Sequence, residues 1–340
     1  MFLSQKEQTN CSNFSSGSYI ESPSAGNWSS EGTTCLFWSI VQNEDLRKIS
    51  ITAIMPLFTF SLVFNLCLFL GIKKSEDLSW NPRYMLLKNL TVSDLLLTLS
   101  VGFPALYCLL RRETLHFSMR CVVQYFMMMV ANFNSLLTSA FMALERYIYT
   151  CHGIQYLVIM TDMRLYSCII LIWLFAVAGA GTSTVLLLMG GARFGHIIPG
   201  FVCEPEVVQA QLEQSEHFET FNKIYIASVL LFCLLMFTFC YGRMYLEARQ
   251  MQQRYQQDNA RTRSTIFFYF VIFLLQLLPS IIKLISMCVK NVDNPLFMVI
   301  LVLIPPCVNP VAYGIRNIEV REALGCLSLS KKIKKLFKLT

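Results

Sequence analysis

Polar side chains with chemical potential stand inside long apolar stretches of this 340-residue chain. The clearest is Asp94, in the run NLTVSDLLL. A carboxylate in apolar surroundings is costly unless it is paired or binds a cation. Such groups could form a site for a small cation or a proton, or they could make structural hydrogen bonds between helices worth roughly 0.6–2 kcal/mol each. Residue chemistry alone leaves both open for Asn65, Asp94, Asn134, Ser135 and Asn309.

Patterns typical of enzymes are missing from the sequence. There is no HExxH motif, and Asp94 has no second aspartate beside it in an apolar run. The thirteen cysteines show neither CxxC nor Cys/His spacing. All four histidines fall in loops or at the ends of apolar runs, so a buried catalytic base has no candidate. We therefore expect no enzyme, no catalytic residue, no zinc or redox centre, no metal beyond a possible sodium ion, and no nucleic-acid partner.

The elements that must position these groups are membrane-spanning helices. The chain is 55% hydrophobic and only 14% charged, whereas soluble proteins carry roughly 25% charged residues. An apolar run of about twenty residues can cross a bilayer as a helix. The predicted fold class is therefore an all-α membrane protein, a seven-transmembrane helix bundle. Its spans are expected at 50–72, 82–110, 118–149, 165–189, 222–246, 263–287 and 295–315.

Charge and glycosylation motifs predict the orientation. Basic residues flank the links after the first and third spans and crowd the link after the fifth span and the C-terminal tail, which predicts a cytoplasmic location for these segments by the positive-inside rule. The loop at 190–221 is acidic, which suits the outside. Three residues, Arg111, Arg112 and Arg120, oppose the rule locally. The N-terminal tail carries three N-glycosylation motifs, at Asn10, Asn13 and Asn27, which predict an extracellular N-terminus.

The C-terminal region reads as a surface-bound segment. The stretch IRNIEVREALGCL has apolar residues at helical spacing, which predicts a short amphipathic eighth helix on the membrane. Cys326 within it is either palmitoylated or idle. The basic end KKIKKLFK favours anionic membrane lipid. The predicted parts are thus a glycosylated tail at 1–48, the seven-helix bundle at 49–315, and the amphipathic helix with its basic tail at 316–340.

Two cysteines are candidates for a disulfide. Cys121 opens the third span, and Cys203 lies in the 190–221 loop. Outside the cell a bond between them would persist and would tie the loop to the top of the third span. Two unpaired thiols are the alternative. The pairing of the other cysteines in tails, loops and span ends stays open: Cys11, Cys35, Cys108 and Cys288.

Motifs over residues 50–326 together resemble one known family. They are Asn65, Asp94, Cys121 with Cys203, Glu145-Arg146-Tyr147, Trp173 and Asn309-Pro310-x-x-Tyr313. This set is similar to that of the rhodopsin-like (class A) G-protein-coupled receptors. Three stretches look like odorant receptors, closest to the fish type: PRYMLLKNLTVSDLLL, MALERYIYTCHGIQYLVIMT and PPCVNPVAYGIRNIEVREAL.

The resemblance implies a function. A small-molecule odorant would bind within the bundle, and a heterotrimeric G protein of the olfactory, stimulatory type would dock at the inner end and raise cAMP. The implied location is the plasma membrane, in olfactory cilia for an odorant receptor. A non-olfactory receptor for a peptide or lipid is the alternative. An ion channel or transporter is a distant one, because paired broken helices and pore charge rings do not appear in the sequence.

The resemblance also assigns roles to residues. Arg146 is implied to pair with Glu145 at rest and to face the G protein in the active state. A sodium ion, the one cofactor implied, would bind Asp94, Ser135 and Asn309. Residues implied in switching and coupling are Glu145, Arg146, Tyr147, Tyr241, Asn309, Pro310 and Tyr313. The implied ligand pocket comprises Met128, Met129, Asn132, Phe133, Tyr225, Ser280, Ile281, Leu284, Val299 and Leu303.

Departures from the family pattern bear on the ligand and the relay. Leu277 stands where many members have an aromatic switch residue, and Phe273 or Phe133 could substitute for it. No acid stands at position 128, which disfavours a biogenic amine, and the seventh span has no lysine for a retinal Schiff base. Lys283 either attracts an anionic ligand or extends to the lipid headgroups.

Overall fold

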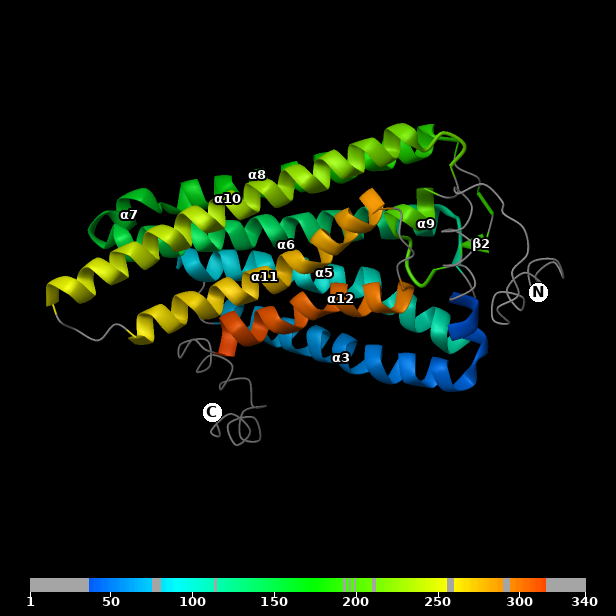
Figure 1. The fold of residues 1–340 in the computed structure, drawn as a ribbon, viewed down its shortest axis with the longest axis horizontal. Coiled ribbons are helices and arrows are strands. Elements are labelled where there is room, and N and C mark those ends of the chain that lie inside the picture. Colours follow the sequence, from blue (N-terminus) through cyan, green and yellow to red (C-terminus); the bar gives the residue numbers. More distant parts are fainter. Residues whose placement is uncertain are drawn as a thin grey trace.

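Seven long helices form a bundle in the structure, a computed structural model (Figure 1). Each is long and apolar enough to cross a membrane, as the sequence predicts. The described residues are 37–74, 81–112, 115–191, 194–195, 197–198, 200–209, 212–255, 260–289 and 294–315. The seven helices are α3 (Glu44–Lys74), α5 (Pro82–Arg111), α6 (Met119–Cys151), α8 (Asp162–Met189), α10 (Glu216–Tyr255), α11 (Ala260–Val289) and α12 (Pro295–Asn309).

Helix ends follow local sequence signals. The side chain of Asn81 caps α5 by accepting a hydrogen bond from the Arg83 N–H at 3.2 Å, and Pro82 occupies the first helical position. Asn294 and Pro295 begin α12 in the same way. Proline fits there because its missing N–H has no helical partner to lose. α10 extends past its predicted apolar run at both ends because polar residues continue the helix beyond the hydrocarbon.

Short elements join the long helices. The link between α6 and α8 contains η1 (Gly153–Gln155) and α7 (Tyr156–Ile159), and α9 (Pro205–Gln209) precedes α10. A two-residue antiparallel pair, β1 (Leu115–His116) with β2 (Ile197–Ile198), is a small departure from the all-α expectation. α12 continues as the π-helical turn η2 (Pro310–Ile315). The predicted eighth helix at 316–326 and the N-terminal glycosylation motifs lie outside the described residues.

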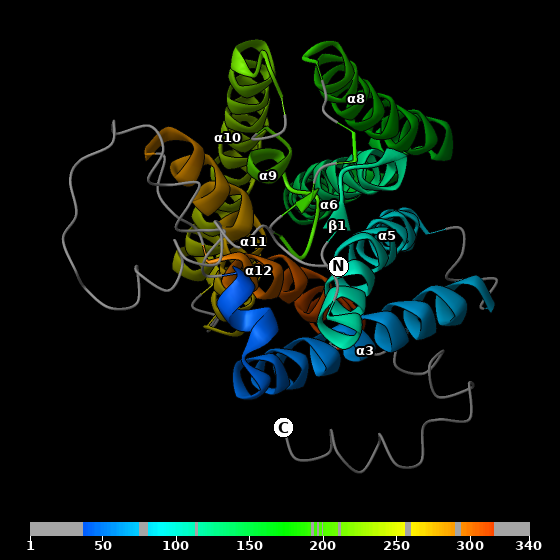
Figure 2. The same ribbon diagram turned by 90° about the vertical axis from the view of Figure 1, so that its right-hand side faces the viewer.

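α6 is the central helix. It contacts α5, α8, α10 and α11, and Figure 2 shows these helices around it. A disulfide joins Cys121, in the first turn of α6, to Cys203, with Cα atoms 5.6 Å apart. We call this end of the bundle the disulfide end and the opposite one the Arg146 end. Because the disulfide fixes the loop to α6, residues 200–205 lie over the disulfide end of the bundle interior.

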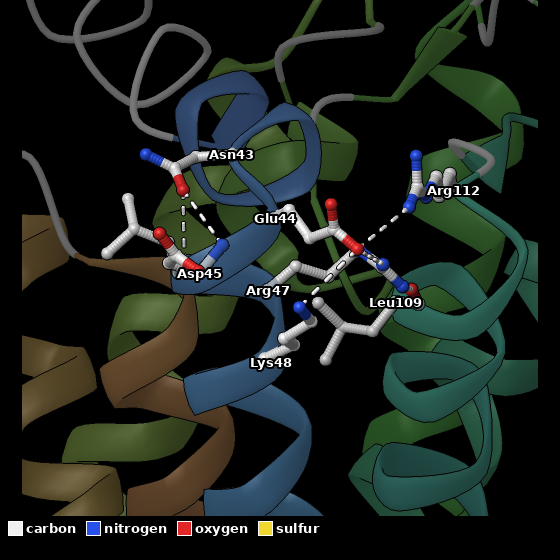
Figure 3. Close-up of polar contacts among 8 residues, drawn as sticks. Asn43, Glu44, Asp45, Arg47, Lys48, Leu109 and Arg112 are labelled. Carbon is white, nitrogen blue, oxygen red and sulfur yellow. Dashed lines mark hydrogen bonds and ion pairs between the residues drawn. The ribbon is translucent and has the colours of Figure 1, made fainter.

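Contacts at the start of α3 hold the disulfide end together (Figure 3). Asn43 caps α3 through the Asp45 N–H at 3.0 Å. The carboxylate of Glu44 lies 3.8 Å from Arg112, which follows α5. Arg47 donates a hydrogen bond to the carbonyl of Leu109 at 3.3 Å. These contacts occupy Arg112, one of the three basic residues that oppose the positive-inside pattern.

Candidate functional site

A cavity of about 60 Å³ lies between α5, α6, α10, α11 and α12 near the disulfide end. Known ligand pockets measure roughly 300–1,000 Å³, so this one must widen to admit a drug-sized molecule. Its wall is mainly apolar. Five of the ten residues predicted for the pocket line it: Met128, Met129, Asn132, Phe133 and Ser280.

The other five predicted pocket residues lie outside the lining, by small errors of register. On α12, Met298 and Val302 line the cavity, whereas Val299 and Leu303 are each rotated one residue further and are buried in the helical core. On α11 the lining residues are Pro279, Ser280 and Lys283, so Ile281 and Leu284 face away from the cavity and pack on the core.

Tyr225 is displaced from the cavity by a close approach of two helices. Its hydroxyl donates to the carbonyl of Phe175 on α8 at 3.1 Å. Its ring occupies the space beside Gly179, where a Cβ atom would overlap it. Ile226 on α10 lines the cavity instead. Tyr225 still packs edge-on against Phe133, with ring centroids 4.5 Å apart.

Four polar side chains give the cavity its chemistry. Asn132 Nδ2 donates to Ser280 Oγ at 3.3 Å. Lys283 Nζ forms an ion pair with Glu204 Oε2 at 2.6 Å, and both side chains are largely buried, at 11% and 16% exposure. Lys283 is therefore neutralised by Glu204, the residue next to the disulfide. The sequence analysis had expected either an anionic ligand or the lipid headgroups as its partner. The cavity thus offers one hydrogen-bonding pair and one internally compensated charge pair.

Beyond the cavity, Asp94 organises a buried polar network at mid-bundle. Ser135 Oγ donates to Asp94 Oδ1 at 3.0 Å, and Asn309 Nδ2 donates to Asp94 Oδ2 at 2.9 Å. Gln276 Nε2 donates to Ser135 Oγ at 2.9 Å. The structure thus brings together α5, α6, α11 and α12 at the three residues predicted for a cation site, and it adds Gln276.

Two amide oxygens in this hydrogen-bond network have unused acceptor capacity. Asn309 Oδ1 and Gln276 Oε1 are both buried and have no hydrogen-bond partner among the described residues. Buried acceptors left unpaired cost roughly 1–3 kcal/mol each, so such atoms call for a ligand or a water. A carboxylate with hydroxyl and amide oxygens is a donor set suited to a hard cation. These residues fit a small cation such as sodium.

Asn65 supports the same region by repairing a proline break. Pro310 lacks an N–H, so the carbonyl of Pro306, four residues earlier, has no helical donor from that position. Asn65 Nδ2 donates to this carbonyl at 2.8 Å. The start of η2 is therefore fixed to α3. The side chain of Tyr313, further along η2, is not among those described.

Between the cavity and the Arg146 end lies an aromatic path. Leu277 is fully buried, and Phe273, one turn further along α11 toward the Arg146 end, is also fully buried and stacks on Phe237 of α10. Phe237 in turn stacks on Tyr241, with centroids 5.1 Å apart. The large side chain missing at Leu277 is thus present one turn away, at Phe273.

Arg146 contacts two tyrosines in the structure, whereas the family resemblance implied Glu145 as its resting partner. Its guanidinium carbon lies 3.4 Å from the centroid of the Tyr269 ring on α11. It also hydrogen-bonds the hydroxyl of Tyr241 on α10. A cation over an aromatic face is attracted by the ring quadrupole. Arg146 therefore links the three helices α6, α10 and α11.

Glu145 turns instead toward the α6–α8 link and α5. It accepts a hydrogen bond from the Tyr156 hydroxyl at 2.9 Å, and its second oxygen lies 3.6 Å from Arg83 Nε. Burial, and then the nearby Glu145 carboxylate, raise the pKa of Tyr156 above its ordinary value, so this hydroxyl remains a donor. The neighbouring Tyr147 packs edge-on against Phe239 of α10.

Several residues of this site were missed by sequence reasoning. Gln276 carried a usable signal, because an amide inside an apolar span is costly unless it has a role. Glu204, Tyr269, Arg83 and Tyr156 carried none, because each depends on a partner distant in sequence. Only the tertiary packing shows which charge meets which ring or hydroxyl.

Comparison with known proteins independently supports the family resemblance seen in the sequence motifs. Residues 64–313 match the model of the family described as 7 transmembrane receptor (rhodopsin family). Human olfactory receptor 2AG1 is 26% identical over 86% of this chain and 93% of its own length. Human olfactory receptor 1J1 is 27% identical over 79% of this chain and 84% of its own. Mouse olfactory receptor 10N1 is 24% identical over 84% and 91%.

Proposed function

Because the chain belongs to the rhodopsin family of seven-transmembrane receptors, we propose that it is an odorant receptor that activates a heterotrimeric G protein. The similarity to olfactory receptors over most of the chain supports the sensory role. The single observation that carries the ligand assignment is the small, mainly apolar cavity with its Asn132–Ser280 pair. It favours a small, neutral, largely apolar molecule with one hydrogen-bonding group.

The proposal includes an orientation at the plasma membrane. The disulfide end faces outward, since disulfides persist in oxidising surroundings. The Arg146 end faces the cytoplasm, where basic residues accumulate. Ligand binding at one end and G-protein docking at the other are then coupled through the Asp94 network and the Phe273–Phe237–Tyr241 path. A ligand shifts this equilibrium only if it binds the active arrangement more tightly.

The odorant assignment is tested by expressing the receptor with an olfactory-type G protein and measuring cAMP against volatile alcohols, ketones and esters. We expect Ser280→Ala to lower the potency of alcohols by about two- to tenfold, because one hydrogen bond contributes roughly 0.5–1.5 kcal/mol. Leu171→Ala, at a 62% exposed site on α8, is the control and should change nothing. Responses to peptides or bilayer lipids alone would favour the non-olfactory receptor.

We also propose that Asp94, Ser135, Asn309 and Gln276 hold a sodium ion in the resting receptor. The unpartnered oxygens of Asn309 and Gln276 support this. The ion would supply a compensating positive charge beside Asp94, and these residues would bind and orient it. A ligand that favours one of two states couples to the agonist with roughly 1–3 kcal/mol.

Sodium dependence is therefore a measurable outcome. Replacing choline with sodium should lower agonist potency in membranes about fivefold or more, the low end of typical coupling. Asp94→Asn should abolish this dependence because it removes the charge while keeping the side-chain shape. Asn134→Ala serves as the control, because Asn134 bonds Ser93 and not Asp94. A sodium effect that survives Asp94→Asn would refute the site.

A further inference from the structure

A second hollow lies on the outside of the bundle, between α5 and α6 near the disulfide end. Its volume is about 600 Å³, ten times that of the interior cavity. Leu99 and Val123 line it, and their side chains are 46% and 57% exposed. The nearby Phe103 is 62% exposed. Exposed apolar side chains at this depth face lipid, so the groove is part of the membrane-facing surface.

The groove is built into the fold at Pro104. Proline has no N–H, so the carbonyl of Ser100, four residues earlier in α5, loses its helical donor. Gln124 of α6 supplies a replacement, because its Nε2 donates to this carbonyl at 3.0 Å. All three residues line the groove. The same hydrogen bond that repairs the helix therefore holds the two walls together at a fixed spacing.

Basic residues lie at the rim of this groove. Arg120, in the first turn of α6, lines it and is exposed. Arg111 ends α5 seven residues after Pro104, which places it two turns further along the same face. Helical side chains tilt toward the N-terminus of their helix, so we expect the Arg111 side chain to reach back toward the rim of the groove. Arg111 and Arg120 make no ion pair within the described part of the chain, whereas Arg112 meets Glu44 (Figure 3).

We propose that this groove binds an acidic glycolipid of the outer leaflet. The apolar walls take the lipid tails, and Arg111 and Arg120 pair with a headgroup oxyanion, for which the guanidinium fork is well suited. The choice of a glycolipid rests on the proposed orientation, because anionic phospholipids concentrate in the cytoplasmic leaflet. The site also explains why arginines stand at the end of the bundle where the positive-inside pattern disfavours them.

The test uses two lipids that differ in one group. The purified full-length receptor in neutral detergent micelles is titrated with sulfatide and with galactosylceramide, which lacks the sulfate, and retained lipid is counted by native mass spectrometry. We expect sulfatide to be retained at least about tenfold more strongly, a difference of about 1.4 kcal/mol, because its sulfate can accept charge-assisted hydrogen bonds from the two guanidinium groups and the neutral sugar cannot. The double variant Arg111→Gln/Arg120→Gln should reduce this preference to about twofold or less.

Arg112→Gln is the matched control. It removes the same charge at the same end of the bundle, but Arg112 stands one residue past the α5 face that carries Pro104 and Arg111, and it pairs with Glu44 of α3. It should keep the full sulfatide preference. Equal retention of the two lipids by the unaltered receptor would overturn the proposal, and so would an equal loss of preference in Arg112→Gln. Because the measurement needs no odorant or G protein, its failure is separable from failure of the proposed function.

Discussion

Replacing Arg146 by alanine is expected to abolish ligand-stimulated cAMP while leaving the receptor folded and at the cell surface. Arg146 carries a permanent charge on α6, at the end opposite the disulfide, and α6 contacts α5, α8, α10 and α11. In the structure it contacts Tyr269 of α11 and Tyr241 of α10. The helix-in-groove mode of G-protein docking would require these helices to separate, which exposes Arg146 to the partner. Normal signalling by Arg146→Ala at normal surface density would contradict this role.

The contact with Tyr269 allows the resting role of Arg146 to be tested separately from its role in the active state. Arg146 and Tyr269 are both half-buried, and a cation–π contact contributes about 0.5–2 kcal/mol, so its loss should raise ligand-independent activity by roughly 2- to 30-fold in the Tyr269→Leu variant. Tyr269→Phe retains the aromatic face and should keep basal activity within about threefold of the unaltered receptor. Phe267→Leu, two residues away and 67% exposed, controls for nonspecific effects on α11. Basal cAMP normalised to surface receptor distinguishes these outcomes, and equal basal activity of Tyr269→Leu and Tyr269→Phe would exclude the contact as a restraint.

The seven spans were predictable because each depends only on a continuous apolar run. Twenty apolar residues cannot remain in water, and a helix satisfies all their backbone hydrogen bonds within the membrane. The Cys121–Cys203 bond was one of two alternatives that the sequence left open, the other being two unpaired thiols, and the structure contains the bond. The meeting of Asp94, Ser135 and Asn309 followed from the family resemblance, and the buried hydrogen bonds give it a physical basis.

Pairings across helices were not predictable, because helix rotation and axial shift are set by packing. A rotation of one residue, about 100°, exchanges Met298 for Val299 and Val302 for Leu303 at the cavity wall. Glu145 and Arg146 are adjacent in sequence yet point in different directions for the same reason. Gly179 shows how a small residue decides such a rotation, because only the absence of its side chain lets Tyr225 approach α8.

Breaking the Glu204–Lys283 ion pair is expected to change which ligands the receptor accepts. In the unaltered receptor a carboxylate ligand must displace Glu204, which the disulfide at Cys203 holds in place. An amine must likewise displace Lys283. Neutral ligands avoid both costs, because the pair can stay intact while they bind. We therefore expect the ion pair in the cavity wall to act as a filter against charged ligands.

Glu204→Gln removes the negative partner and leaves the Lys283 ammonium largely buried at the cavity, where a charge without its counter-ion is unfavourable. A carboxylate ligand can then replace Glu204. We expect the potency ratio of a carboxylic acid to the alcohol of the same carbon skeleton to rise by roughly 10- to 150-fold, the equivalent of one charged hydrogen bond of about 1.5–3 kcal/mol. Lys283→Gln should instead raise the potency ratio of an amine to the alcohol of the same carbon skeleton.

The reversed pair Glu204→Lys/Lys283→Glu provides the decisive comparison. It keeps both charges and their attraction but exchanges their positions, so the cavity is again neutral. If the ion pair excludes charged ligands, the double variant should return the acid-to-alcohol ratio close to that of the unaltered receptor, with neutral ligands preferred. If Lys283 instead served directly as an anion-binding residue, the unaltered receptor would already prefer acids over alcohols and the reversed pair would lose them. If Glu204 neutralises Lys283, the reversed pair should restore the preference for neutral ligands. If Lys283 binds anions directly, the reversed pair should lose the response to acids. One set of dose–response curves therefore decides between the two roles.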